Sequence, residues 1–222
     1  AWACQGGLRA IFAAFGLGKS VIQLEVIRLC MLRDGCDGLI VLPLGVRQEF
    51  TRDAAMLGIE TKFIRRAEEI EPGKIHLTNY ETIRDGKLDP TLFGAVSLDE
   101  ASILRGFGGT KTFREFMATL AGDDKRDMHS RVRTAGVKYR FVATATPSPN
   151  EYIELLAYAA YLGIMDVGQA KTRFFKRDST KADKLTLHAH KEQEFWLWVA
   201  SWAPFVQRPS DLGCSDDGYT MP

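Results

Sequence analysis

The segment from Ala13 to Ser20 carries the strongest chemical signal in the sequence of 222 residues. It follows an apolar run at residues 10–13 and precedes residues 21–32, where the apolar positions have helical spacing. Glycine adopts positive φ without steric cost, and a helix N-terminus directs unpaired N–H groups at an anion. A strand, a glycine-rich turn and a helix together predict a phosphate-binding loop.

Each residue type in this loop has a separate expected role. We expect the phosphates to contact Gly16, Leu17, Gly18, Lys19 and Ser20. Lys19 would place a positive charge beside the β- and γ-phosphates, and the Ser20 hydroxyl would ligate Mg²⁺. Ala13 occupies the position of the first glycine in the general pattern G-x-x-x-x-G-K-[ST].

A pair of acids, Asp99 and Glu100, directly follows the apolar run at residues 95–98. Mg²⁺ keeps several waters and needs one or two protein oxygens, so Asp99 could hold it together with Ser20. Glu100 would orient or deprotonate the attacking water. We therefore predict Lys19, Asp99 and Glu100 as the catalytic residues.

The order of the predicted elements indicates an α/β fold. Apolar runs predict strands at residues 10–13, 39–42, 61–64, 75–78, 95–98 and 139–143, with helices at 19–32, 46–57 and 150–162 among those between and after them. Alternating strands and helices predict a mostly parallel sheet with helices on both faces. The polar clusters follow the strands, so they should meet at the carboxyl edge of the sheet.

Composition gives few constraints on partners. Lys and Arg number 29 and Asp and Glu 28, a net charge of +1, so any nucleic-acid binding requires a local patch. The four cysteines lack the spacing of a zinc site or a disulfide scaffold. No apolar run approaches the ~20 residues of a membrane helix. We expect a cytoplasmic protein without a membrane partner.

Five motifs in order resemble the first RecA-like lobe of superfamily-two helicases of the DEAD/DEAH type. They are Ala-x-x-Gly-x-Gly-Lys-Ser, Leu-Ile-Val-Leu-Pro, Leu-Thr-Asn-Tyr-Glu, Leu-Asp-Glu-Ala-Ser and Ala-Thr-Ala-Thr-Pro-Ser-Pro-Asn. Within that superfamily the sequence is most similar to the Swi/Snf-like DNA translocases, whose Thr-Gly-Thr-Pro-x-x-Asn pattern is matched at residues 144–150. Ser102 stands where that branch usually has histidine.

The resemblance implies a RecA-like P-loop NTPase that binds ATP and Mg²⁺ and couples hydrolysis to movement along nucleic acid, with DNA favoured over RNA. It implies coupling through Thr144 and Thr146. It implies nucleic-acid contacts by Pro43, Gly45, Thr78 and Asn79, which Arg105, Lys111 and Arg114 could extend. It also implies a second RecA-like lobe that would supply an arginine to the γ-phosphate. Residues 1–208 would form the first lobe, and 209–222 a linker toward the second.

Two other functions stay open from the sequence. One is a P-loop kinase or another NTPase with a small acceptor, although no acceptor site or lid is evident. The other is a non-catalytic nucleotide-binding interaction module, although Lys19, Ser20, Asp99 and Glu100 are all present. Among the remaining residues, we expect internal packing, and not stacking on bases, of four aromatic residues: Phe195, Trp196, Trp198 and Trp202. We do not expect His188 and His190 to bind a metal.

Overall fold

The computed structural model describes residues 1–101, 104, 114, 116–118, 120, 136–148, 151–177 and 185–219. Seven strands form one sheet in the order β3-β4-β2-β5-β6-β1-β9, and every neighbouring pair is parallel. The strands are β1 (Leu8–Ala13), β2 (Gly38–Leu42), β3 (Thr61–Phe63), β4 (Ile75–Asn79), β5 (Ala95–Asp99), β6 (Tyr139–Thr144) and β9 (Phe205–Val206). The predicted parallel sheet is confirmed.

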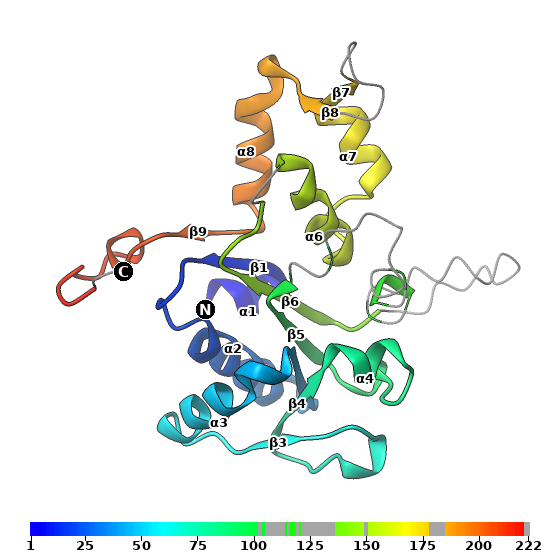
Figure 1. The fold of residues 1–222 in the computed structure, drawn as a ribbon, viewed down its shortest axis with the longest axis vertical. Helices are drawn as coiled ribbons and strands as arrows, with labels where there is room; N and C mark the ends of the chain where they lie inside the picture. Colours follow the sequence, from blue (N-terminus) through cyan, green and yellow to red (C-terminus); the bar gives the residue numbers. More distant parts are fainter. Residues whose placement is uncertain are drawn as a thin grey trace, which may run out of the picture.

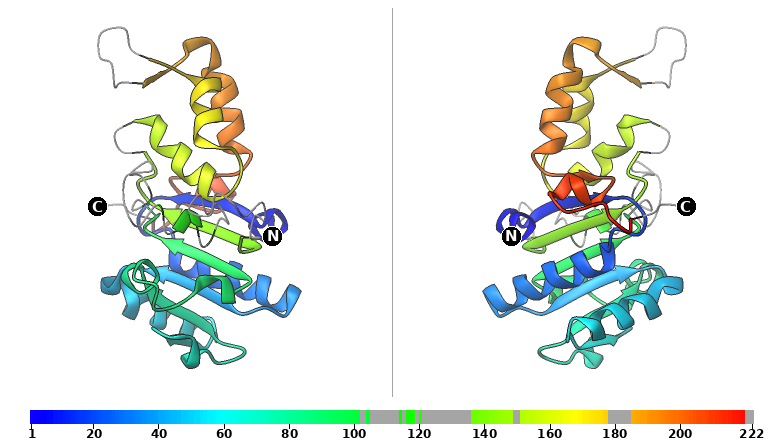
Figure 2. Two further views of the ribbon diagram at one scale, coloured as in Figure 1. Left: turned by 90° about the vertical axis from the view of Figure 1, so that its right-hand side faces the viewer. Right: turned by 90° about the vertical axis from the view of Figure 1, so that its left-hand side faces the viewer.

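Helices connect these strands and cover the sheet (Figures 1 and 2). They are α1 (Trp2–Gly6), α2 (Lys19–Asp34), α3 (Arg47–Met56), α4 (Tyr80–Arg84), α6 (Leu155–Tyr161), α7 (Val167–Phe174) and α8 (Glu192–Ala200). Figure 1 shows α6, α7 and α8 near β1, at the opposite end of the sheet from β3. A small antiparallel pair, β7 (Phe175–Arg177) and β8 (Leu185–Leu187), joins α7 to α8.

Strand β2 shows why both faces of the sheet are covered. All its residues are buried, as expected for a strand in the middle of a parallel sheet. Because successive side chains point to opposite faces, Leu39 and Val41 pack in the core that includes α6 and α8, whereas Ile40 and Leu42 pack with α2 and α3. Helices on both faces, as predicted, remove both apolar surfaces from water.

The structure adds elements that the sequence did not predict. Strand β9 pairs with the end of β1, and β7 and β8 form their own sheet. The predicted helix at 150–162 contains a 3₁₀ turn at Tyr152–Glu154 followed by α6. Several residues named above lie outside the described part of the chain: Ser102, Arg105, Lys111, Pro149 and Asn150.

The aromatic residues of α8 and its C-terminal end pack internally. Phe195 and Trp202 are almost completely buried, and the Phe195 ring lies 5.3 Å from that of Phe174. Trp196 and Trp198 are half-buried and pack against the same core. The expectation of interior packing is therefore confirmed for Phe195 and Trp202 and holds only in part for the other two.

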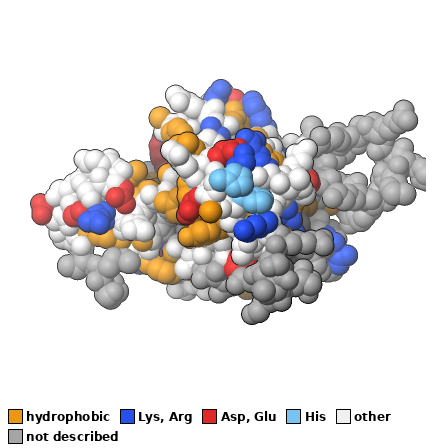
Figure 3. Space-filling view, turned by 90° about the horizontal axis from the view of Figure 1, so that it is seen from above, with side chains coloured by type: hydrophobic (Ala, Val, Ile, Leu, Met, Phe, Trp, Pro, Cys, Tyr) orange, Lys and Arg blue, Asp and Glu red, His pale blue; other side chains and the backbone are white. Residues whose placement is uncertain are grey.

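The two C-terminal histidines show no metal cluster. His188 and His190 have ring centroids 5.1 Å apart. Figure 3, which shows the molecule from above, has histidine side chains next to both acidic and basic side chains. Among the described residues, no group of three His, Cys, Asp or Glu side chains could hold a metal ion.

No helix in the same part of the chain has the length and apolar character needed to span a membrane.

Candidate nucleotide-binding site

The predicted phosphate loop connects the end of β1 to the start of α2. Gly16 and Gly18 have φ values of 76° and 66°, in the left-handed region that favours glycine. Gly18 directly precedes α2, so the unpaired N–H groups of the first helical turn face the loop. The Lys19 ammonium donates to the Ala14 carbonyl oxygen at 3.3 Å and lies 5.0 Å from the centre of the Phe15 ring. The local geometry matches an anion cradle.

Alternation along β5 directs Asp99 toward α2. Val96 and Leu98 belong to the core on the α6 side, so Ser97 and Asp99 face the other side. There the Gln23 amide donates to Asp99 Oδ1 at 2.8 Å and accepts from the Ser97 hydroxyl at 2.6 Å. All three side chains are buried. Gln23 therefore fixes the position of the Asp99 carboxylate relative to α2.

The environment of Asp99 suits a cation. Burial raises the pKa of Asp99 from 3.8 to about 6, the Gln23 hydrogen bond opposes this rise, and the Glu100 charge adds to it. Lys19 lies one turn before Gln23 on α2, and its positive charge also lowers the pKa of Asp99. A buried carboxylate with a neutral donor is an incompletely compensated charge, and a divalent ion beside it would supply the compensation.

The backbone of Glu100 has an unusual conformation. Its φ of 48° makes it the only residue other than glycine with positive φ in the part of the chain described. Such conformations cost free energy and concentrate at functional sites. Glu100 Oε2 lies 3.5 Å from the Thr144 hydroxyl oxygen, which in turn accepts from the Thr146 N–H at 3.2 Å. The structure thus brings the acid pair and the threonine motif together.

A cavity of about 570 Å³ lies beside the phosphate loop. It is lined by residues 12–14 of β1 and the loop, by Ala145 and Pro147 of the threonine motif, and by residues 205–208. Its lining does not include Lys19 or Asp99, so it adjoins the phosphate cradle and is separate from it. The C-terminal segment approaches the same loop, because the Tyr219 hydroxyl donates to the Phe15 carbonyl at 3.1 Å.

The four predicted nucleic-acid contacts have different environments. Gly45 is exposed and Pro43 is half-buried, at the carboxyl end of β2. Thr78, however, is fully buried and donates its hydroxyl to the Ile64 carbonyl oxygen at 2.8 Å. The expectation that this hydroxyl is available to a ligand is therefore wrong, because Thr78 holds the segment after β3 against β4. Asn79 is buried as well, and its amide donates to Glu81.

Exposed arginines lie at the same edge of the sheet and were missed in the sequence. Arg47 follows β2, and Arg65 and Arg66 follow β3, with β4 between these two strands. The guanidinium carbons of Arg47 and Arg65 lie 4.4 and 5.8 Å from the centre of the Phe63 ring. Cation–π contacts of this kind orient a guanidinium while leaving its N–H groups available. We call Arg47, Arg65 and Arg66 the arginine group.

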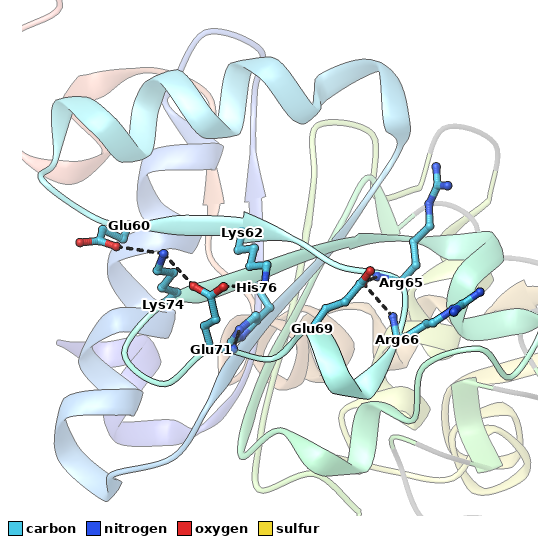
Figure 4. Close-up of polar contacts among 8 residues, drawn as sticks. All are labelled: Glu60, Lys62, Arg65, Arg66, Glu69, Glu71, Lys74 and His76. Carbon is cyan, nitrogen blue, oxygen red and sulfur yellow. Dashed lines mark hydrogen bonds and ion pairs between the residues drawn. The ribbon is translucent and has the colours of Figure 1, made fainter.

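The lysine side chains near β3 form ion pairs, whereas the guanidinium groups that follow this strand point away from the nearest carboxylate (Figure 4). Lys62 and Lys74 both bind Glu71, at 2.6 and 2.8 Å. Glu69 instead accepts from the backbone N–H groups of Arg65 and Arg66, and their guanidinium ends extend away from it in Figure 4. In the described part of the chain, no ion pair involves these two arginines.

Comparison with solved structures identifies the fold. The chain superposes on the Sulfolobus solfataricus SWI2/SNF2 ATPase core in complex with dsDNA with a TM-score of 0.66 and 17% identity, over 93% of this chain and 42% of that one. The fold is an α/β RecA-like fold. The UvsW helicase of bacteriophage T4 matches less well, with 14% identity, a TM-score of 0.49, and coverage of 74% of this chain and 56% of that one. No protein-family model and no curated protein matches.

Several residues of this RecA-like fold that surround the predicted site were missed in the sequence. Gln23 lies one turn after Lys19, and Ser97 lies two residues before Asp99 on the same strand face, so helical and strand spacing could have indicated both. Asp53 of α3 accepts a hydrogen bond from the Ser20 hydroxyl. No sequence pattern connects Asp53 to the loop, because only the packing of α3 against α2 brings them together.

Proposed function

We propose that this RecA-like lobe binds ATP with Mg²⁺ and hydrolyses it as part of a nucleic-acid-dependent helicase or translocase. One observation supports the proposal: Asp99, at the carboxyl end of β5, is hydrogen-bonded to Gln23, which lies one turn after Lys19 on the helix that begins at the loop. The fold is shared with a SWI2/SNF2 ATPase core, which supports this class over a kinase.

Each residue of the site would have a separate chemical role. Lys19 and the N–H groups of the first turn of α2 would bind the β- and γ-phosphates. Ser20 and Asp99 would hold Mg²⁺, which neutralises charge on the phosphate oxygens. Glu100 would accept a proton from the attacking water or orient it. The Thr144 hydroxyl, next to Glu100, would link the state of this site to the threonine motif.

Two observations support duplex DNA as the partner. The SWI2/SNF2 core was solved in complex with dsDNA. The arginine group and Gly45 are exposed after neighbouring strands at one edge of the sheet. Guanidinium and backbone N–H groups bind phosphate oxygens without reading sequence, which suits a motor that moves along any sequence. We therefore propose that the DNA backbone binds this edge.

The proposal extends to a second lobe outside this chain. The chain spans 42% of the length of the SWI2/SNF2 core. An arginine supplied to the γ-phosphate from elsewhere accounts for roughly 10³ to 10⁵ in the rate of phosphoryl transfer. We infer that the complete enzyme obtains this arginine from a second RecA-like lobe.

Binding of a fluorescent ATP analogue tests the proposal directly. Lys19→Ala should abolish Mg²⁺-dependent binding, because it removes the positive charge that faces the phosphates. Lys87→Ala, which changes an exposed lysine outside the site, is the matched control and should bind as the wild type does. Equal affinity in all three proteins would rule out the loop as the phosphate site.

A further inference from the structure

Asp53 contacts the magnesium-binding hydroxyl from outside the recognised motifs. It lies in α3, which packs against α2, and its Oδ2 accepts the hydrogen bond of Ser20 Oγ. Ser20 and Asp53 are only 7% and 6% exposed, so water competes little for this contact. Asp53 Oδ1 has a separate partner, Arg52 Nη2 at 3.3 Å. Each carboxylate oxygen therefore has its own donor.

The direction of this hydrogen bond matters for metal binding. A serine hydroxyl has one O–H donor and two lone pairs, and a cation binds only through a lone pair. If the O–H donates its hydrogen bond to a carboxylate, both lone pairs of the serine oxygen remain available to the cation. Hydrogen bonding to an ionised acceptor also increases the electron density on the donor oxygen.

We propose that Asp53 is a positioning residue for Mg²⁺: it accepts the Ser20 proton and so presents the Ser20 oxygen to the metal. The inference rests on the function proposed above and adds a third carboxylate to the site, one that does not touch the metal. Such outer partners of metal ligands typically contribute roughly 10- to 100-fold to metal affinity.

The test measures binding of a fluorescent ATP analogue as a function of Mg²⁺ concentration and again in EDTA. Asp53→Asn keeps the shape of the side chain and removes its charge. We expect this variant to need roughly 10- to 100-fold more Mg²⁺ for half-maximal binding, with its affinity in EDTA unchanged. Ser20→Ala should raise the Mg²⁺ requirement as well. Adding Asp53→Asn to Ser20→Ala should then raise it no further, because Asp53 acts through the Ser20 hydroxyl.

Glu49→Gln is the matched control, since Glu49 lies one turn earlier on α3 and is exposed. It should keep the wild-type Mg²⁺ requirement. Thermal melting without nucleotide verifies folding, and if Asp53→Asn does not fold, Asp53→Ser replaces it with the same expectation.

Three outcomes would overturn the inference. In the first outcome, the Asp53 variant needs the same or less Mg²⁺ than the wild type, while Ser20→Ala needs more. This result rejects the role of Asp53 in Mg²⁺ binding and leaves the proposed function intact. An additional loss in the double variant assigns Asp53 a role independent of Ser20. A wild-type protein that binds no Mg²⁺–nucleotide overturns the proposed function and this inference together.

Discussion

In the absence of a ligand, the buried position of Asp99 disfavours the negative charge of its carboxylate. Its pKa of about 6 lies well above the unperturbed 3.8, mainly because burial disfavours the carboxylate. At neutral pH the free protein therefore holds a costly buried charge, and binding of a cation relieves that cost. Gln23 reduces the penalty without removing it, because an amide supplies one neutral hydrogen bond.

This shift predicts how the stability of the metal-free protein depends on pH. Between pH 4 and 6 the native state binds a proton at Asp99 that the unfolded chain has released, so the free energy of unfolding falls as pH rises through this interval. The full effect is at most roughly 3 kcal/mol. Asp99→Asn should be more stable than wild type at pH 8, and the difference should disappear near pH 4.

Urea unfolding in EDTA at several pH values measures this difference. Ser97→Ala serves as a control for local packing, since it alters the same hydrogen-bonded group and keeps the Asp99 carboxyl. A pH profile of Asp99→Asn that is parallel to that of the wild type would show that Asp99 titrates normally.

The elements at the carboxyl edge of the sheet carry the expected contact with DNA. Arg65 and Arg66 follow β3, and the buried Thr78 hydroxyl holds this segment against β4. At the other end of the same strands, Glu71 has a pKa lowered to about 2 by its hydrogen bonds with Lys62 and Lys74. Each end therefore carries two cationic side chains. The two lysines are paired with Glu71, whereas the two guanidinium groups remain available to a polyanion.

This contrast predicts a difference between two double variants. Arg65→Gln with Arg66→Gln should weaken duplex DNA binding and reduce the slope of log affinity against log salt by about 2, because two phosphate contacts are lost. Lys62→Gln with Lys74→Gln removes the same formal charge from paired positions and should change the slope much less. Fluorescence anisotropy at several salt concentrations measures both. Equal effects would indicate that only net charge matters.

At the scale of the whole molecule, the proposed function assigns only part of the catalytic chemistry to this chain. Under that proposal, Lys19 and Asp99 would hold the triphosphate and its metal, and the arginine at the γ-phosphate would come from a second lobe. We predict that this chain alone binds ATP and hydrolyses it roughly 10³-fold or more below the rate of the complete enzyme. Glu100→Gln should lower the remaining rate further and leave nucleotide binding intact.

A phosphate-release assay with and without duplex DNA measures this rate, and Glu192→Gln, at an exposed acid in the first turn of α8, controls for the loss of one acid. Rapid turnover by the isolated chain would contradict the need for a second lobe. Undiminished turnover in Glu100→Gln would assign the water-activating role to another residue.

The sequence by itself determined the parallel α/β fold and the positions of its chemistry. The apolar runs at residues 39–42 and 95–98 indicated strands buried on both faces, and Gly16 and Gly18 indicated a loop that requires positive φ. These signals are local: each depends on residues within one turn or one strand. The placement of Lys19 and Asp99 at the same edge then followed from the common direction of parallel strands.

Only the tertiary structure decided which side chains support the site. Asp53 reaches Ser20 across a distance in sequence that no local pattern spans. Helical spacing could have indicated Gln23, but its hydrogen bond to Asp99 depends on how α2 packs on the sheet. Thr78, which appeared available for a ligand, is fully buried. The physical reason is that hydrogen bonding and burial between elements depend on how helices pack on the sheet, and that packing is a property of the whole fold.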